Sequence, residues 1–474
     1  MSDQYGKIIS LILQERFGDV VESVANYLFR YGPSTLFHLK KFTEIPVSKI
    51  KDSLAVLLKY NLVSTKSKHN TIMYTLLSNK VLLMLRYPKY VKTLKKKFGV
   101  EAGMVMEEIL QKGYVKHTDL IDAVLLRLST IGNGIHKNVL EEKIKSLEIA
   151  NYLINYKIGE DIKVDEKKLT TKVYTVNFDR FHQDMRDELI VQAFENKFDS
   201  NAGELIRLFI QQMYVRTEPW AETSNPVPTL EVKDIVKKMN SFPLLLASFD
   251  HYITVLDQDT SKFMQKVGEA SGGSYQLCMK GIFTVFAWEI CEQIVLEKFD
   301  SKAARIFRLV KNKSYIEPEQ IQKLAMIPAK EAKRLSYQLV EENFFQIQEL
   351  KKVASASNTG PNKSFVLFHI QFNCLVRTII EMCYKTLFNV MTRRTHFKFL
   401  NKRIIDKKQR IDTILLSMKA QGAAEEQLQD IEEMLTPPER EVLAKIEISL
   451  KKLNALEIEI DETLFYLELY LHYQ

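Results

Sequence analysis

The chain is poor in residues that interrupt helices. Its 474 residues include only 16 glycines and 12 prolines. Because both residues disfavour helix interiors, this scarcity favours helices and argues against a long disordered region. No apolar run approaches the roughly 18 to 20 residues that a membrane-spanning helix needs. The first residues, MSDQYGKIIS, lack the regions of a signal peptide. We therefore expect a largely helical intracellular protein without a membrane segment.

Cysteine and catalytic motifs are also scarce. Cys278, Cys291, Cys374 and Cys383 show no CxxC spacing, so we interpret them as reduced core thiols. The motifs GxxxxGK[ST], HExxH and GxSxG do not occur, and the nine histidines are scattered. We therefore expect no catalytic site, no cofactor and no metal in this chain.

The most informative pattern that is present is a repeated helix motif. Residues 45–63 (IPVSKIKDSLAVLLKYNLV) and 327–345 (IPAKEAKRLSYQLVEENFF) align without a gap, and residues 135–153 form a weaker third copy. The leading proline suits a helix N-terminus, and apolar residues at i, i+4 and i+7 line one helix face. The asparagine near the end tolerates the left-handed conformation that stops many helices. The repeat predicts one module used several times.

Each copy stands in the same order of predicted elements. Two short amphipathic segments precede it, residues 20–31 and 35–42 in the first module and 303–312 and 318–324 in the last, and two β-like segments follow. Helix, helix, helix and hairpin is the order of a winged helix, whose third helix can enter a major groove.

The length allows several such modules, since roughly 80 to 100 residues suffice for one. We predict a mainly α fold with small β wings, in which tandem extended winged-helix domains precede a C-terminal antiparallel coiled coil. The expected boundaries are residues 1–90, 91–178, 179–278 and 279–370 for winged helices 1 to 4, and 371–474 for the coiled-coil hairpin. The third module is the least regular of the four. Residues 158–169 and 354–363 are expected to be loops at the tips of two wings.

The C-terminal part carries two heptad patterns. Apolar residues recur at 3,4 spacing in residues 397–418 and 443–471, interrupted by Lys407 and Glu457. Pro437 and its neighbouring proline separate the two arms. The first arm is basic and the second acidic, so the arms attract each other when folded back. This favours an antiparallel hairpin over a parallel homodimer, in which like charges would face each other.

The net charge of +8 is unevenly spread. Basic stretches at residues 86–100 and 393–419 add to the cations around the third helices and wings of the first and fourth modules. Such cations can reach phosphates or an acidic partner, although a solvated helix face explains any single run as well. The candidates for contact with nucleic acid or an acidic partner are Lys49, Lys51, Lys59, Lys66, Lys68, Lys92, Lys95, Lys96, Lys97, Lys330, Lys333, Arg334, Arg393 and Arg394.

The expected outward face of the first module's third helix carries Ser48, Asp52, Ser53 and Val56. Reading of base edges usually needs Arg, Asn or Gln on that face, and an aspartate opposes phosphate. We therefore expect non-sequence-specific DNA contact or protein docking from this module.

Six segments between Leu11 and Glu468 carry a family resemblance: residues 11–22 (LILQERFGDVVE), 82–90 (LLMLRYPKY), 304–310 (ARIFRLV), 325–344 (AMIPAKEAKRLSYQLVEENF), 420–440 (AQGAAEEQLQDIEEMLTPPER) and 457–468 (EIEIDETLFYLE). Through them the whole chain resembles the large winged-helix subunit of eukaryotic RNA polymerase III. Residues 155–280 match this family in layout more than in letters.

The resemblance implies a nuclear, non-catalytic subunit with four extended winged helices. It implies a heterotrimer on the clamp of polymerase III with two smaller subunits, one winged-helix and one acidic. It further implies promoter recruitment through the polymerase III initiation factor, and contact with single-stranded or melted DNA. No residue-level site is transferred by it.

Two other interpretations stay open from the residues alone. A free-standing winged-helix regulator would bind duplex DNA tightly and with sequence preference. A winged-helix scaffold of another assembly, such as a ubiquitin ligase, would have no affinity for nucleic acid. An enzyme is a more distant alternative, which predicts a polar pocket with strongly perturbed pKa values.

Overall fold

The computed structural model describes residues 3–68, 71–130, 137–157, 172–239, 242–269, 272–351, 364–420, 427, 431 and 434–474. The two expected wing-tip loops, residues 158–169 and 354–363, lie outside the described residues. Contacts divide the chain into two compact units. The first unit comprises Met1–Tyr114 and Glu381–Thr463, and the second comprises Val115–Ile380 and Leu464–Gln474.

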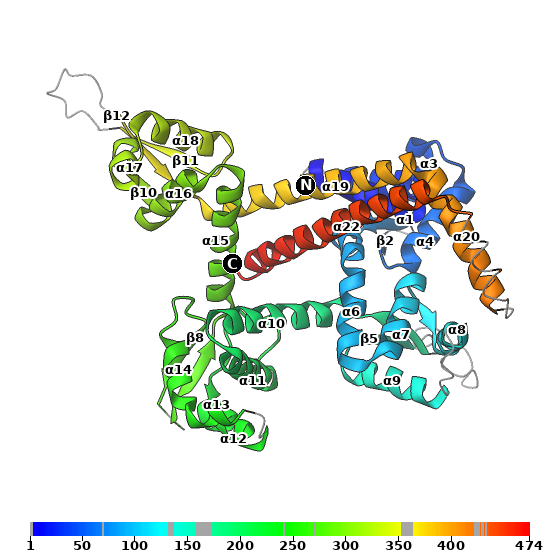
Figure 1. Cartoon of the computed structure of the whole chain (residues 1–474), viewed down its shortest axis with the longest axis horizontal. Helices are drawn as coiled ribbons and strands as arrows, with labels where there is room; N and C mark the ends of the chain where they lie inside the picture. Colours follow the sequence, from blue (N-terminus) through cyan, green and yellow to red (C-terminus); the bar gives the residue numbers. More distant parts are fainter. Residues whose placement is uncertain are drawn as a thin grey trace. The chain divides into compact units, whose positions relative to one another are not determined.

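One order of elements recurs along the chain: two helices, a short strand, two or more helices and a β-hairpin (Figure 1). Its first occurrence comprises α1 (Asp3–Phe17), α2 (Asp19–Tyr31), β1 (Ser34–Thr35), α3 (Leu36–Thr43), α4 (Val47–Lys59), β2 (Val63–Lys68) and β3 (Thr71–Leu76). After α5 (Ser78–Leu82) and η1 (Leu83–Arg86), the second comprises α6 (Tyr87–Phe98), α7 (Val100–Lys112), β4 (Val115–Lys116), α8 (His117–Thr130), α9 (Lys137–Ile149), β5 (Leu153–Lys157) and β6 (Lys172–Val176).

The same order occurs twice more. The third occurrence comprises α10 (Phe178–Lys197), α11 (Ser200–Arg216), β7 (Val227–Pro228), α12 (Thr229–Met239), α13 (Pro243–Ala247), α14 (Phe249–Asp257), β8 (Met264–Gly268) and β9 (Ser274–Leu277). The fourth comprises α15 (Met279–Lys298), α16 (Ser301–Lys313), β10 (Tyr315–Ile316), α17 (Pro318–Ala325), α18 (Ala329–Glu341), β11 (Gln346–Lys351) and β12 (Ser364–His369). The predicted mainly α class with small β wings is confirmed.

Each wing is part of a three-stranded antiparallel sheet rather than a lone hairpin. The strand orders are β1-β3-β2, β4-β6-β5, β7-β9-β8 and β10-β12-β11. In the first sheet the central strand β3 pairs with β2 along its length and with β1 through Ser34↔Tyr74 and Thr35↔Met73. The sequence did not predict β1, β4, β7 and β10, because a strand of two residues shows no alternating pattern.

The repeated motif forms the helix before the wing in the first, second and fourth modules. In α4 the apolar residues Ile50, Leu54 and Leu57 are buried on one face, and Pro46 precedes the first helical residue. The predicted helix stop is confirmed, since Asn61 has a φ of 54° and its equivalents Asn151 and Asn343 have 60° and 61°.

One expectation about α4 is wrong. Ser53 is 3% exposed instead of facing outward, and its hydroxyl donates a hydrogen bond to the carbonyl of Lys49 at 2.7 Å. Its equivalent in α18, Leu335, is buried as well. Ser53 can be buried at this position because its hydroxyl is satisfied by the preceding turn of the same helix.

The C-terminal helices are α19 (Phe372–Leu400), α20 (Lys402–Ala420) and α22 (Pro437–His472). In the first unit, ion pairs join Lys407 to Glu439 at 2.7 Å, Lys408 to Glu447, and Arg394 to Glu457. Partner numbers fall along α22 as they rise along the other arm, so the predicted antiparallel hairpin is confirmed. The two charges that interrupt the heptads, Lys407 and Glu457, both belong to these pairs.

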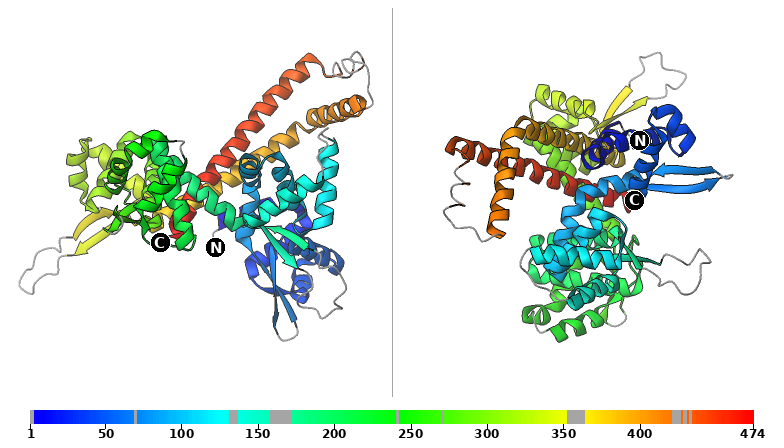
Figure 2. Two further views of the ribbon diagram at one scale, coloured as in Figure 1. Left: turned by 90° about the horizontal axis from the view of Figure 1, so that it is seen from below. Right: turned by 90° about the vertical axis from the view of Figure 1, so that its right-hand side faces the viewer.

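The first arm of the hairpin is not one continuous helix. It breaks at Asn401, and α20 leaves the line of α19 there (Figures 1 and 2). Asn401 donates a side-chain hydrogen bond to the carbonyl of Phe397 at 2.9 Å. Leu400 and Ile414, which the heptad pattern places in the seam, are consequently 64% and 44% exposed. The seam is therefore irregular beyond Leu400, where Ile411 is buried but Ile414 is not.

The cysteines are all free thiols, but only two of them are buried. Cys291 and Cys383 lie in the core, where burial raises the pKa of each thiol to about 12. Cys278 is half-buried and Cys374 is exposed, so the expectation of core thiols is wrong for Cys374. Within the described ranges, no helix has the length and hydrophobicity to cross a membrane, and no group of side chains could hold a metal ion.

The end of α4 docks against the end of α7 inside the first unit. Gly113 has a φ of +79°, and a Cβ at this position would lie 2.4 Å from the carbonyl oxygen of Lys59. Beside it the hydroxyl of Tyr60 donates a hydrogen bond to the carbonyl of Gln111. Only glycine combines this backbone conformation with so close an approach.

Replacing Gly113 with alanine is expected to destabilise the first unit. Gly18→Ala serves as the control, because Gly18 also has a positive φ, +85°, but nothing lies within 4 Å of an added Cβ. The control should cost about 1 to 3 kcal/mol from backbone strain alone. Gly113→Ala should cost more, because its Cβ also meets backbone. Urea denaturation of both variants measures this, and equal losses would contradict the close docking.

Candidate nucleic-acid and protein interface

The first winged helix presents an unpaired basic surface. Lys49, Lys51 and Lys59 are exposed on α4, and Lys66 is exposed on β2. None of these four forms an ion pair with another described residue. Lys68 ends β2, and its side chain lies outside the description. Around Ser48 and Asp52, which are also exposed, the α4 face carries lysine but no Arg, Asn or Gln.

The fourth winged helix, in the second unit, has a different outward face. Lys330, Lys333 and Arg334 are exposed on α18, and no ion pair with another described residue occupies them. Tyr337 and Gln338 are exposed on the same helix. Arginine and glutamine can pair with base edges, which lysine and serine on α4 do less well. The repeat therefore keeps its core but varies the chemistry of its exposed helix.

The basic run at residues 86–100 divides into an inward and an outward half. Its inward half meets α22 in the first unit: Arg86 Nε donates to Asp461 Oδ1 at 2.8 Å, and Lys89 Nζ lies 3.1 Å from Asp461 Oδ2. The side chains of Arg86 and Asp461 are 5% and 6% exposed. These two cations are therefore committed to holding the C-terminal helix and are not available to a partner.

The outward half of this run follows α6. Lys92, Lys95, Lys96 and Lys97 are all exposed on this helix. Lys95 forms an ion pair with Glu107 of α7 at 2.7 Å. The predicted candidates on this run thus share one solvent-facing surface, which we call the α6 lysine face.

The second basic run also divides. Arg393 is exposed, but the side chain of Arg394 is only 12% exposed and pairs with Glu457 and with Glu15, the latter at 3.0 Å. Burial raises the pKa of Glu457, and the charge of Arg394 opposes this rise. Arg394 therefore ties α19 to α1 and α22, and we drop it from the proposed contact surface.

A second buried arginine closes the second unit. Arg186 of α10 is fully buried, and its Nη1 donates to the hydroxyl of Tyr473 at 2.6 Å. Asp187 and Tyr214 also accept hydrogen bonds from Arg186, at 2.7 and 2.6 Å. Burial raises the pKa of Tyr473, so its phenol stays neutral at cellular pH.

The structural charges Asp461 and Arg186 were not among the residues predicted from the sequence. One signal for Asp461 was present: it is a carboxylate between Ile460 and Leu464, inside the apolar part of the second arm. A carboxylate among buried residues needs a cationic partner, and Arg86 begins a run without acids. For Arg186 no comparable sequence signal exists, because α10 is not strongly amphipathic and its charges are mixed.

Four family models match separate parts of the chain. They describe the RNA polymerase III subunit RPC82 helix-turn-helix domain (residues 7–64), RNA polymerase III subunit RPC82 (136–285), the POLR3C C-terminal winged-helix domain (291–370) and the RNA polymerase III subunit RPC3 helical hairpin domain (403–466). The matches follow the order of winged helices and hairpin seen in the structure.

Relatives that match the chain over its whole length or over part of it share the same description. DNA-directed RNA polymerase III subunit RPC3 of Homo sapiens is 32% identical over 98% of both chains. The protein of that name from Danio rerio is 30% identical over 100% of this chain and 99% of its own. The Dictyostelium discoideum protein is 22% identical over 48% of this chain and 35% of its own.

Removing the buried carboxylate should destabilise the first unit strongly. Asp461→Ala removes the buried carboxylate that Arg86 and Lys89 share, and breaking a buried pair in this way costs about 3 to 5 kcal/mol. The control is Asp3→Ala, which removes the exposed Asp3–Lys7 pair of α1 and should cost about 0.5 kcal/mol or less. Urea denaturation compares the two free energies of unfolding. A loss for Asp461→Ala no larger than that of the control would show that this contact does not hold α22.

Proposed function

The chain belongs to the RNA polymerase III subunit RPC3 family, and we propose that it is a nuclear, non-catalytic subunit of DNA-directed RNA polymerase III. The observation that carries this proposal is the match over 98% of both chains to the human subunit, at 32% identity. A generic winged-helix regulator or scaffold would share the modules but not the C-terminal hairpin, which has its own family match at residues 403–466.

We further propose that the chain works in a heterotrimer on the polymerase clamp. Its two smaller partners would be another winged-helix subunit and an acidic subunit, and the heterotrimer would engage the polymerase III initiation factor at promoters. The α6 lysine face supports an acidic partner, because its four exposed lysines follow one helix and give it a dense positive charge. The winged helices supply further exposed faces for docking.

The proposed contact with DNA is electrostatic and without sequence preference. Lys49, Lys51, Lys59 and Lys66 can approach phosphates from the third helix and wing of the first module. The same face lacks the Arg, Asn and Gln that most base reading uses, and Asp52 on it opposes close insertion into a groove. Such a surface suits DNA that the polymerase opens and holds, where backbone contact matters more than sequence.

Purification of the tagged chain from nuclear extract tests the assembly. The unmodified chain should recover the polymerase III core and two smaller subunits in near-equal amounts. The triple variant Lys95→Glu, Lys96→Glu and Lys97→Glu should keep the core and lose the acidic subunit, because reversed charges repel it. The control reverses three exposed lysines elsewhere, Lys40, Lys145 and Lys323. Recovery of the chain alone would contradict membership in the polymerase. Full recovery of the acidic subunit by the triple variant would contradict the role of the α6 lysine face.

DNA binding by the first module is tested by charge neutralisation. Lys49→Gln, Lys51→Gln and Lys59→Gln should weaken binding of the full chain to all sequences alike. Each lost phosphate contact should make the negative slope of log affinity against log salt shallower by about 0.7 for single strands and 0.9 for duplex. Fluorescence anisotropy with two unrelated oligonucleotides measures this, and Lys40→Gln, Lys145→Gln and Lys323→Gln provide the control. A loss confined to one sequence would indicate base reading instead.

A further inference from the structure

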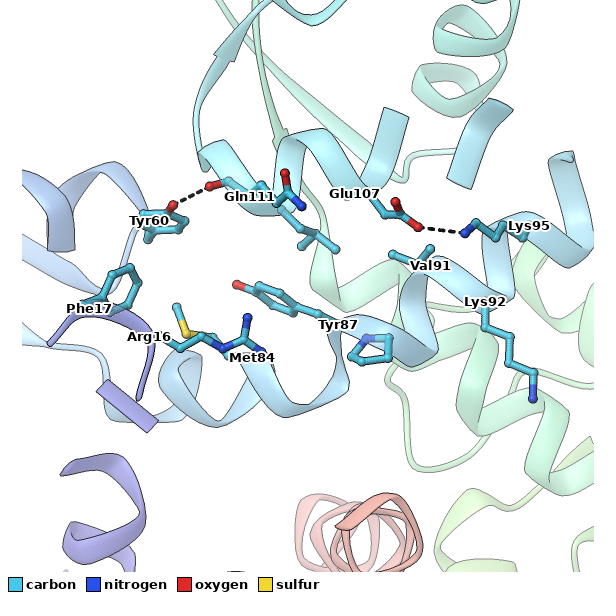
Figure 3. A pocket seen from close by; sticks show the side chains of 12 residues that line it. Arg16, Phe17, Tyr60, Met84, Tyr87, Val91, Lys92, Lys95, Glu107 and Gln111 are labelled. Atoms are coloured by element: carbon cyan, nitrogen blue, oxygen red, sulfur yellow. Dashed lines mark hydrogen bonds and ion pairs between the residues drawn. The ribbon is translucent and has the colours of Figure 1, made fainter. Parts of the chain in front are cut away.

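A pocket opens in the first unit where α6 meets the ends of α1, α4 and α7 (Figure 3). Its volume is about 620 Å³, which lies within the range of about 300 to 1,000 Å³ typical of ligand pockets. The apolar part of its wall is formed by Phe17, Tyr60, Met84, Tyr87, Val91 and Leu110.

The wall of this pocket is held in place by contacts of its own. The hydroxyl of Tyr60 is bound to the carbonyl of Gln111, and the ring of Phe17 lies 5.0 Å from that of Tyr60. Met84 and Leu110 are buried beneath them. The close approach of Gly113 to Lys59 fixes the end of α4 against α7. The hollow is therefore pre-formed, which lowers the entropic cost of filling it.

The interior of the pocket is uncharged and its rim is basic. Burial raises the pKa of Tyr87 to about 12, so the phenol at the centre of Figure 3 is neutral at cellular pH. Arg16, Lys92 and Lys95 stand at the rim with one acid, Glu107, which pairs with Lys95. Arg16 and Lys92 have no ion-pair partner among the described residues. Two rim cations thus remain for an anionic ligand.

We propose that this pocket anchors an acidic segment of a partner protein through one bulky apolar side chain. The apolar wall excludes charge but accepts an aromatic or large aliphatic group, while Arg16 and Lys92 attract carboxylates on either side of that group. A nucleic-acid strand fits less well. Half of its apolar wall, Met84, Val91 and Leu110, is aliphatic and offers no stacking surface to a base.

The inference does not depend on the polymerase assignment, because it rests on the pocket alone. The pocket selects a bulky apolar side chain of the partner. The exposed lysines cannot do this, because they attract any negatively charged segment alike. An apolar anchor inside a charged rim gives both orientation and affinity.

The pocket is tested with labelled peptides and the full chain. One peptide has a tryptophan flanked by two glutamates on each side, a second replaces the tryptophan by alanine, and a third replaces the glutamates by glutamine. Fluorescence anisotropy should show roughly tenfold weaker binding for the second and third peptides. Val91→Glu, which puts a charge in the wall, should abolish the preference for tryptophan. Lys92→Glu should weaken the acidic peptide but not the glutamine peptide.

Two controls make the outcome decisive. Val100→Glu changes a valine of α7 that is 55% exposed and outside the pocket, and it should bind like the unmodified chain. If Val91→Glu lowers the melting temperature, the test rests on the Lys92→Glu variant, because Lys92 is exposed and its replacement should not affect folding.

Equal binding of the tryptophan and alanine peptides would overturn the proposal. Oligodeoxythymidine could also displace the acidic peptide from the unmodified chain. If the Val91→Glu variant no longer shows this displacement, the site would be reassigned to nucleic acid. Recovery of the polymerase core by Val91→Glu is measured separately, so failure of the pocket leaves the proposed function standing.

Discussion

In each unit a buried arginine binds the C-terminal segment, which is α22 and the residues that follow it, and stabilises its packing. In the first unit Arg86 and Lys89 share Asp461 of α22, a contact between residues 375 positions apart. In the second unit Arg186 meets Tyr473, 287 positions away. In the first unit an unpaired charge in such surroundings would cost several kcal/mol, so the contact with Asp461 strongly favours the docked helix. In the second unit Asp187 pairs with the charge of Arg186, and Tyr473 adds a buried hydrogen bond to it. The earlier modules and the C-terminal segment therefore depend on each other for their stability, although they are far apart in sequence.

The repeated module shows how one scaffold serves different surfaces. The buried positions of α4 and α18 are equivalent, because the packing of the third helix on its module constrains them. They are Ile50, Ser53, Leu54 and Leu57 in α4 and Ala332, Leu335, Ser336 and Leu339 in α18. The exposed positions are free of that constraint and differ: α4 carries mainly lysine, while α18 adds Arg334 and Gln338. Differences in function between the modules are thus expected on the exposed faces of helices whose buried faces match.

The same separation explains which basic residues remain available to partners. Charge counted along the sequence treats residues 86–97 as one run, but a helix turns its successive side chains in different directions. Arg86 and Lys89 face α22, whereas Lys92 and Lys95 to Lys97 face solvent. Arg393 and Arg394 divide in the same way although they are neighbours. A linear run therefore overstates the charge that a binding surface can use.

The sequence by itself determined the elements whose signals are local or repeated. Proline at the start of a helix, asparagine at its end and the spacing of Ile50, Leu54 and Leu57 are read along the chain, and they predicted the third helices correctly. The heptads and opposite charges of the two arms predicted the antiparallel hairpin, and segments along the whole chain predicted the family.

Only the tertiary structure decided which distant residues meet. The two-residue strands, the pairing of Asp461 with Arg86, the break at Asn401 and the pocket beside Tyr87 have no local pattern. Each depends on the packing of segments that are separate in sequence, and the free energy of such contacts exists only once those segments are brought together.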